Sequence, residues 1–331
     1  MPEYEIREYR DGDLPSLLET FDAVFGTPGS DRPARTVEEW EYVYQRNPAG
    51  WRIWVAACEG KVVAQYAARA YRAWMDGRER GFAEIVDSMV HPDHRAGLKS
   101  PGLFVQTALP FFDAYGGPEH PRDVVHYGWP VEKAYRIGDL FLHYNVYRSQ
   151  TVLAREPGPG PAERPAGVEV LDRFGPDAEA LYRRLRDDWG TSTIRDEAFL
   201  NWRFVDNPFH RYRIFAVRDG AGGLAGYAVY RLGNWILQNM GLVVDWLVPW
   251  DEPEAAELLK EAVLAQARAD GAESSALLIP DWSSWFERFQ RWGWYVWPTD
   301  YLMVGRTFDP RYPLFWLRDH WWYTLADSDL A

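Results

Sequence analysis

The strongest constraint on how this chain folds is an internal repeat. The dipeptide Asn-Pro stands at residues 47–48 and again at residues 207–208, which lie 160 positions later. A segment typical of a strand follows each copy, residues 52–56 (RIWVA) and 213–217 (RIFAV), and a glycine-containing turn leads into a second such segment. A repeat of this period within 331 residues predicts two similar domains rather than one large core.

The match between the two halves continues beyond these strands. Residues 86–92 (VDSMVHP) resemble residues 244–249 (VDWLVP), and a long helix is expected after each, at residues 103–115 and 254–270. Gly271 is expected to end the second of these helices. A further strand and a further helix follow in both halves. We therefore predict an α/β (α+β) fold with the same elements in the same order in both domains.

One segment is well suited to separate the domains. Residues 155–165 (REPGPGPAERP) contain so many prolines and glycines that neither a helix nor a central strand is expected there. We predict a first domain at residues 1–154, a linker at residues 155–167 and a second domain at residues 168–331.

Charge and cysteine content exclude several function classes. With 36 Lys+Arg against 49 Asp+Glu the formal net charge is -13, which disfavours nucleic acid as a partner and favours cationic ligands such as amines. The single cysteine, Cys58, rules out a disulfide within the chain and a cysteine-based zinc site. The sequence has neither a signal-peptide pattern nor an apolar run of about 18 residues, so we expect a cytoplasmic protein with no membrane partner.

Residues 90–104 (VHPDHRAGLKSPGLF) join a strand of the first half to its long helix. A strand that ends in Val-x-Pro, followed by a loop with arginine and glycine that opens a long helix, resembles the GCN5-related N-acetyltransferase (GNAT) superfamily in its tandem two-domain form. The resemblance implies that each domain is a mixed, mostly antiparallel sheet flanked by helices. It also implies that loop amides bind the pyrophosphate of the co-substrate acetyl-CoA. The cofactor-binding residues that it implies are Met89, Val90, Arg95, Ala96, Gly97, Lys99, Gly102 and Leu103.

This loop suits an anion for physical reasons. Unpaired N–H groups and a partial positive charge at the start of a helix attract phosphate. Gly97 and Gly102 let the backbone approach closely, and Arg95 and Lys99 add charge-assisted contacts. The loop holds about three more residues than the family pattern, so a plain strand-to-helix turn is the alternative. Residues 248–254 (VPWDEPE) of the second half lack both glycine and arginine, so we expect a single acetyl-CoA site, in the first domain.

Two carboxylates on the strand before this loop are candidate catalytic residues. The resemblance implies that an acidic residue there takes a proton from the amine, and that amides at Met89 and Val90 polarise the thioester carbonyl. Glu84 and Asp87 are separated by an odd number of positions, so alternation predicts that they point to opposite faces. Because Asp87 recurs as Asp245 in the half without a cofactor loop, we prefer Glu84 as the base.

The sequence leaves the general acid unassigned. The resemblance implies a tyrosine in the helix before a Gly-Phe or Gly-Tyr pair, but overlaying residues 142–144 on that pair places Asp139 at the expected position. Tyr135, one helical turn earlier, is the third catalytic candidate, and a role as a core aromatic is its alternative. Residues 91–94 (HPDH) offer too few ligands for a metal ion, so no metal site is expected.

The chain is rich in aromatic residues, with 18 tryptophans. Rings recur at helical spacing in residues 281–292 (DWSSWFERFQRW), which predicts a helix capped by Asp281 whose aromatic stripe is core rather than a ligand platform. Residues 316–329 form an aromatic and then acidic tail. It resembles tails of tandem acetyltransferase-like proteins encoded with surface-polysaccharide pathways, which implies an amino-sugar substrate, whereas packing of the tail on a domain is the alternative.

Two functions of different class follow. The first is an acyl-CoA-dependent N-acyltransferase, an enzyme that moves an acetyl group from acetyl-CoA to the amine of a small polar substrate such as an amino sugar. The alternative is a catalytically degenerate tandem protein that binds a ligand or a partner in the cleft between its domains. The Val-x-Pro strand end, Arg95 and the glycines favour the enzyme, and the extra loop residues favour the alternative. A homodimer is one option for the oligomeric state.

Overall fold

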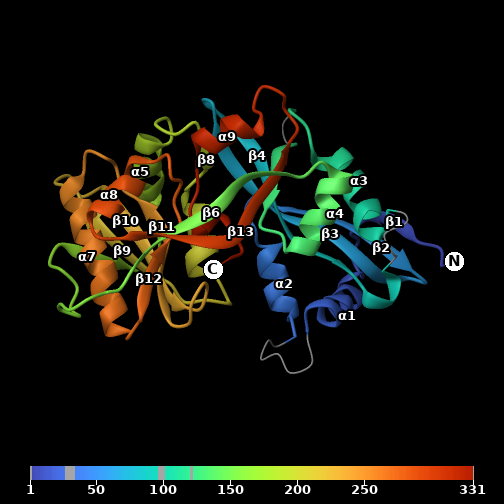
Figure 1. Ribbon diagram of the computed structural model, residues 1–331, viewed down its shortest axis with the longest axis horizontal. Coiled ribbons are helices and arrows are strands. Elements are labelled where there is room, and N and C mark those ends of the chain that lie inside the picture. Colours follow the sequence, from blue (N-terminus) through green and yellow to red (C-terminus); the bar gives the residue numbers. More distant parts are fainter. Residues whose placement is uncertain (1, 27–33, 96–100, 120–121, 331) are drawn as a thin grey trace. The chain divides into compact units, whose positions relative to one another are not determined.

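The computed structural model describes residues 2–26, 34–95, 101–119 and 122–330. The chain forms two compact units, and Figure 1 labels their elements. Unit 1 comprises Met1–Arg72, Arg80–Arg148 and Leu302–Leu314. Unit 2 comprises Ala73–Glu79, Ser149–Tyr301 and Phe315–Ala331.

Unit 1 is built on a mixed sheet with the strand order β1-β2-β3-β4-β5-β13. Its strands are β1 (Glu5–Glu8), β2 (Trp51–Cys58), β3 (Lys61–Met75), β4 (Arg78–Val90), β5 (Asp123–Gly128) and the last part of β13 (Tyr295–Thr307). Its helices are α1 (Leu14–Phe25), α2 (Val37–Val43), η1 (Pro92–His94), α3 (Leu103–Tyr115) and α4 (Glu132–Leu142). β1–β2, β2–β3 and β5–β13 are antiparallel pairs, and β4–β5 is parallel. The predicted mixed, mostly antiparallel sheet is confirmed.

In unit 2 the strands follow in the order β13-β6-β12-β11-β10-β9-β7, and the first part of β13 belongs to this unit. Its strands are β6 (Asn145–Arg155), β7 (Val168–Leu171), β8 (Thr191–Thr193), β9 (Arg213–Arg218), β10 (Leu224–Gly233), β11 (Met240–Leu247), β12 (Ser274–Leu277) and β14 (Trp321–Trp322). Its helices are α5 (Pro176–Leu185), α6 (Glu197–Leu200), the π-helix η2 (Asn201–Val205), α7 (Pro253–Ala269), α8 (Ser284–Arg291), α9 (Leu314–His320) and η3 (Leu325–Asp327). β11–β12 is parallel, whereas β9–β10, β10–β11, β7–β9 and β6–β12 are antiparallel.

Each sheet takes one strand from the other half of the chain. β5 pairs with β13, from Gly128 opposite Val304 onward, although β6 is the strand that directly follows α4. β6 pairs with β12, with Arg155 opposite Ser275. An unpaired strand edge is unfavourable, and this exchange covers the edges of both β5 and β12. The units therefore differ from the predicted consecutive domains, which the linker was expected to separate.

The long helices expected from the sequence are confirmed. α3 spans Leu103–Tyr115 as predicted, and α7 spans Pro253–Ala269. α8 begins later than predicted because Ser283 caps it, with the Ser283 side chain accepting a hydrogen bond from the backbone N–H of Trp285. The predicted cap at Asp281 is therefore wrong. No helix within the described ranges is both long enough and apolar enough to cross a membrane.

Gly138 in α4 is expected to tolerate no side chain. A Cβ there would lie 2.1 Å from Cδ2 of Tyr144, whose buried ring belongs to the core cluster of unit 1. Alanine favours a helix over glycine by about 1 kcal/mol, whereas overpacking costs about 1–3 kcal/mol. A clash this close lies at the upper end of that cost, so Gly138→Ala is expected to lower the free energy of unfolding by about 2 kcal/mol. Urea unfolding followed by tryptophan fluorescence measures this loss. Gly220→Ala, whose new Cβ would meet no atom within 4 Å, is the control, and equal effects would contradict the packing argument.

Candidate active site

The end of strand β4 separates from its neighbour in unit 1. β4 pairs in parallel with β5 from Gly81 to Glu84, and it then continues to Val90. Among the described strand pairs, the backbone groups of residues 85–90 on the β5 side therefore have no partner in that ladder. N–H and C=O groups that a sheet leaves unpaired can bind an extended ligand. In this segment the carbonyl oxygens of Asp87 and Val90 already accept hydrogen bonds, from Gln65 Nε2 and Arg95 Nε. The predicted amides of Met89 and Val90 lie in this segment.

The end of β4 lies close to the start of helix α3. Val90 and Leu103, the first residue of α3, pack in one apolar cluster with Val63. The backbone N–H of His91 donates to the carbonyl oxygen of Val63 at 2.8 Å, which holds the strand end. Arg95 Nε donates to the carbonyl oxygen of Val90 at 3.0 Å, so the exposed Arg95 side chain lies along the strand end.

The start of α3 offers backbone donors to a ligand. Its N-cap, Gly102, has an extended backbone (φ −74°, ψ 179°), and no side chain among the described residues caps the helix there. The first N–H groups of a helix have no partner within the helix, and they favour an anion. The predicted residues Ala96, Gly97 and Lys99 lie outside the described residues. Arg95 and Gly102 thus mark the two described ends of the predicted phosphate loop.

Glu84 is fully buried in a polar cluster. Its carboxylate is 0% exposed, and Oε2 accepts hydrogen bonds from Arg69 Nε at 3.0 Å, from Arg69 Nη2 at 2.5 Å and from the Tyr71 hydroxyl at 3.0 Å. The arginine compensates the buried negative charge. Since no part of the carboxylate is exposed, a substrate would have to displace these partners to touch it. This geometry favours a positioning role for Glu84.

Asp87 lies at a break in β4. Its backbone has a φ of 52°, in the left-handed region that residues other than glycine rarely adopt. Its carboxylate accepts a hydrogen bond from the Tyr44 hydroxyl at 2.8 Å and forms an ion pair with Arg35. The side chain is 15% exposed, in contrast to Glu84. Such breaks in strands re-aim a side chain, and they occur often beside active sites.

The two carboxylates belong to one polar cluster, which corrects the argument from strand alternation. Burial and the charge of Asp87 raise the pKa of Tyr44. The charges of Arg35 and Arg69 oppose this rise, so both guanidinium groups lie near the phenol. Arg35 is the partner of Asp87 and Arg69 is the partner of Glu84. The positive φ at Asp87 interrupts the alternation of side chains on which the expected opposite faces of Glu84 and Asp87 depended.

Tyr135 lies with the apolar core of unit 1. It is half-buried and packs against the cluster that contains Tyr66, Phe111 and Tyr144. The Tyr66 and Tyr144 hydroxyls contact each other, and burial raises the pKa of both phenols. Among the described residues, these contacts group Tyr135 with the core and not with the two carboxylates. The predicted alternative, a core aromatic, fits this position.

The corresponding strand end in unit 2 is filled by aromatic side chains. β11 also continues past its parallel ladder with β12, which ends at Val243. There the indole N–H of Trp285 donates to the carbonyl oxygen of Val248 at 3.2 Å, and its ring centroid lies 5.6 Å from that of Trp246. The next helix, α7, has Glu252 as its N-cap, and a carboxylate there disfavours phosphate. These features argue against an acyl-CoA site in unit 2.

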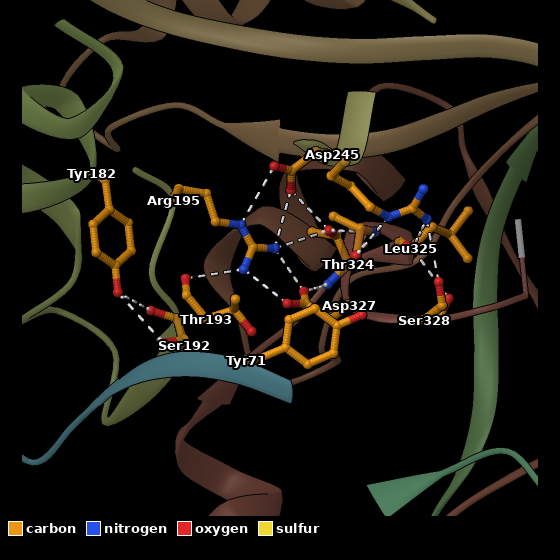
Figure 2. Close-up of polar contacts among 12 residues, drawn as sticks. Tyr71, Tyr182, Ser192, Thr193, Arg195, Asp245, Thr324, Leu325, Asp327 and Ser328 are labelled. Atoms are coloured by element: carbon orange, nitrogen blue, oxygen red, sulfur yellow. Dashed lines mark hydrogen bonds and ion pairs between the residues drawn. The ribbon is translucent and has the colours of Figure 1, made fainter. Parts of the chain in front are cut away.

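The aspartate of unit 2 that matches Asp87 is sealed inside a charge cluster. Figure 2 shows the guanidinium of Arg195 between the carboxylates of Asp245 and Asp327. Arg195 Nη2 lies 2.6 Å from Asp327 Oδ2 and 3.3 Å from Asp245 Oδ1, and the Thr324 hydroxyl donates to Asp245 Oδ1 at 2.8 Å. The charged side chains are all 0% exposed. Asp245 is therefore a structural residue, held by the C-terminal tail.

The sequence analysis missed the arginine partners of Asp87 and Asp245, although the internal repeat indicates them. Arg35 and Arg195 lie 160 positions apart, the same spacing as the two Asn-Pro dipeptides. Each arginine directly precedes a helix N-cap, Thr36 or Asp196. Extending the repeat to these positions would have predicted an arginine beside each aspartate.

A family model covers part of unit 1. Residues 5–98 match the model described as an acetyltransferase (GNAT) domain. The match includes β4 with both carboxylates, and it ends within the loop that precedes α3. No curated protein is similar enough in sequence to count as a match.

Solved structures resemble nearly the whole chain in fold. A probable N-acyltransferase from Enterococcus faecalis is 13% identical with a TM-score of 0.66, over 95% of this chain and 74% of that one. A GCN5-related N-acetyltransferase from Anabaena variabilis is 13% identical with a TM-score of 0.62, over 93% and 73%. An N-myristoyltransferase from Saccharomyces cerevisiae with bound myristoyl-CoA is 13% identical with a TM-score of 0.56, over 93% and 84%. Residues 5–98 are therefore similar to a GNAT acetyltransferase domain, and the chain shares its fold with solved structures described as a probable N-acyltransferase and a GCN5-related N-acetyltransferase.

Proposed function

We propose that unit 1 transfers an acetyl group from acetyl-CoA to the amine of a small polar substrate. The observation that carries this proposal is the separation of β4 from β5 at residues 85–90, which lie within the GNAT match, together with the start of α3 at Leu103, which packs in one apolar cluster with Val90. Residues 85–90 of β4 offer a strand edge for an extended arm, and the start of α3 offers a helix N-terminus for a pyrophosphate. Acetyl-CoA has both of these parts.

The proposal gives each end of the loop a role. Backbone groups of residues 85–90 bind the pantetheine arm, and the amides of Met89 and Val90 polarise the thioester carbonyl. The N–H groups at the start of α3 and the Arg95 guanidinium bind the pyrophosphate. An amine then attacks the carbonyl carbon. A C–N bond forms, the C–S bond breaks, and the departing thiolate of coenzyme A takes up a proton.

We assign Asp87 as the group that receives the proton lost by the amine. A general base must come within hydrogen-bond reach of the substrate, and the side chain of Asp87 is 15% exposed whereas that of Glu84 is 0% exposed. This choice reverses the preference derived from the sequence. Glu84 then holds Arg69 and Tyr71 in place through its hydrogen bonds. The proton donor to the thiolate is not assigned, and Tyr135 stays a candidate for it.

A cationic amine fits the charge of the chain, since the formal net charge is -13. Within this class we propose an amino sugar as the acceptor. A thiol-release assay with acetyl-CoA and a panel of amines tests the choice, with glucosamine, spermidine and a peptide N-terminus as the three arms. Release with glucosamine alone supports it. Binding of acetyl-CoA without thiol release from any amine would favour the second function, a degenerate protein that binds a ligand.

Arg95→Ala and Gly102→Asp are each expected to weaken acetyl-CoA binding by about tenfold to a hundredfold, because each removes or opposes charge-assisted contacts to the pyrophosphate. Isothermal titration with the intact chain measures this. Arg46→Ala removes an exposed arginine whose partner is Glu41, and it serves as the control for loss of charge. Absence of binding by the unsubstituted chain, or an equal loss in Arg46→Ala, would overturn the proposed site.

A further inference from the structure

Unit 2 contains a pocket of about 970 Å³ that lies apart from the strand end of β11. The end of β7, the start of β9 and the end of β10 meet at one edge of the sheet, and the segment from Phe204 to Tyr212 covers that edge. The π-helix η2, a rare element that occurs often at functional sites, leads into this segment. Asn207 stabilises the turn within this segment, because its Oδ1 accepts hydrogen bonds from the backbone N–H groups of Phe209 and His210.

A buried arginine lines this pocket without an acidic partner. Arg231 is 7% exposed, and among the described residues no carboxylate forms an ion pair with it and no atom accepts a hydrogen bond from its Nε. Its one hydrogen bond runs from Nη1 to the adjacent carbonyl of Leu232, at a long 3.4 Å. A Cβ on Gly233 would lie 2.0 Å from Nη1, so the guanidinium fills the space that a side chain would take.

Three arginines (Arg211, Arg213 and Arg231) and two aspartates (Asp172 and Asp270) line the pocket, and the charges that act on Arg231 itself include that of another arginine. Burial and the charge of Arg203 lower the pKa of Arg231. Partial desolvation and the charges of Arg231 and Arg203 lower the pKa of His210 to about 4. Arg203 donates hydrogen bonds to the Tyr212 hydroxyl and to carbonyl oxygens of the C-terminal tail. A buried cation without a counter-ion is costly, and an anion from solution would remove that cost.

The neighbouring strand offers Arg231 no carboxylate at its own register. Its cross-strand neighbour in β11 is Leu242, an apolar residue. In unit 1, by contrast, the buried Arg69 is compensated by an ion pair with Glu84.

We propose that this pocket of unit 2 binds a small organic anion, with Arg231 paired to its carboxylate or phosphate group. The pocket volume lies in the range of small-molecule sites and exceeds what an inorganic phosphate needs. Phe204, Ile214 and Leu232 supply apolar walls, and Asn207 and Tyr212 supply polar groups. The expected ligand therefore carries one anionic group on an apolar body.

Isothermal titration of the full chain with phenyl phosphate, with benzoate and with inorganic phosphate tests this proposal. Phenyl phosphate or benzoate is expected to bind, and the better of the two identifies the anionic group. Arg231→Gln is expected to weaken that binding by about tenfold to a hundredfold. Leu242→Glu keeps the arginine but places a carboxylate at its cross-strand neighbour, and it is expected to weaken binding as strongly. Arg164→Gln removes an exposed arginine outside the pocket and is expected to bind unchanged.

Three results would overturn the proposal. The first is no binding of any probe by the unsubstituted chain, and the second is an equal loss of affinity in Arg164→Gln. The third is displacement of phenyl phosphate by acetyl-CoA, which would show that the anion occupies the acyl-CoA site. Because the site in unit 1 is titrated separately with acetyl-CoA, failure of either proposal leaves the other intact.

Discussion

Replacing Arg195 by methionine is expected to lower the free energy of unfolding by about 3–5 kcal/mol. The guanidinium is 0% exposed, and it lies between the carboxylates of Asp245 and Asp327, which are 0% exposed as well. Methionine approximates the length of the arginine side chain, but it removes the cation that lies between the two buried carboxylates. Urea unfolding followed by tryptophan fluorescence measures the loss.

Arg218→Met is the matched control for this substitution. Arg218 also pairs with two carboxylates, Glu169 and Asp177, but its side chain is 38% exposed. Exposed ion pairs contribute little, so the expected loss is below about 1 kcal/mol. If the two substitutions lowered the free energy of unfolding equally, burial of the charges would not explain the effect at Arg195.

Asp87→Asn is expected to lower kcat by about 10²- to 10⁴-fold while the Kd for acetyl-CoA stays unchanged. The amide can keep hydrogen bonds to Tyr44 and Arg35 but cannot take a proton from the amine. Thiol release at saturating acetyl-CoA, with the amine that reacts fastest, gives kcat, and isothermal titration gives Kd. This prediction depends on the proposed transfer reaction.

Two further variants make the assignment of the base falsifiable. Asp11→Asn changes an exposed carboxyl group elsewhere in unit 1 and is expected to leave kcat unchanged. Glu84→Gln breaks the buried pair with Arg69 and is expected to lower the melting temperature. If the Glu84→Gln variant folded but had a strongly lowered kcat, while Asp87→Asn kept the kcat of the unsubstituted chain, the base would be Glu84. That result would contradict the assignment to Asp87.

Much of the local structure was predictable because its signals are local. The helix at 103–115 follows from apolar spacing and from Gly102 before it, and the structure gives α3 the same bounds. The paired strands of each half follow from alternation and from the glycine turns. The cap of α8 was missed because serine and aspartate both cap helices and stand two positions apart in residues 281–283.

The candidate site was predictable only in part. Glu84 and Asp87 were found, because charged residues within an apolar strand are unusual. The directions of their side chains were not predictable, because the positive φ of Asp87 leaves no mark in the sequence and its partners, Arg35 and Tyr44, are distant in the chain. Arg231 was overlooked for a similar reason. A lone arginine in a sequence gives no sign that the residue opposite it is Leu242 rather than a carboxylate.

By itself the sequence determined the repeat, the kinds and order of the elements, and the strand, loop and helix that carry the candidate site, since each depends on neighbours within a few positions. Only the tertiary structure decided which strands pair and which charges meet. β13 rather than β6 joins β5, and Arg195 reaches Asp327, 132 positions away. Hydrogen bonds between strands and buried ion pairs depend on groups that are distant in the chain and become neighbours only when the core forms.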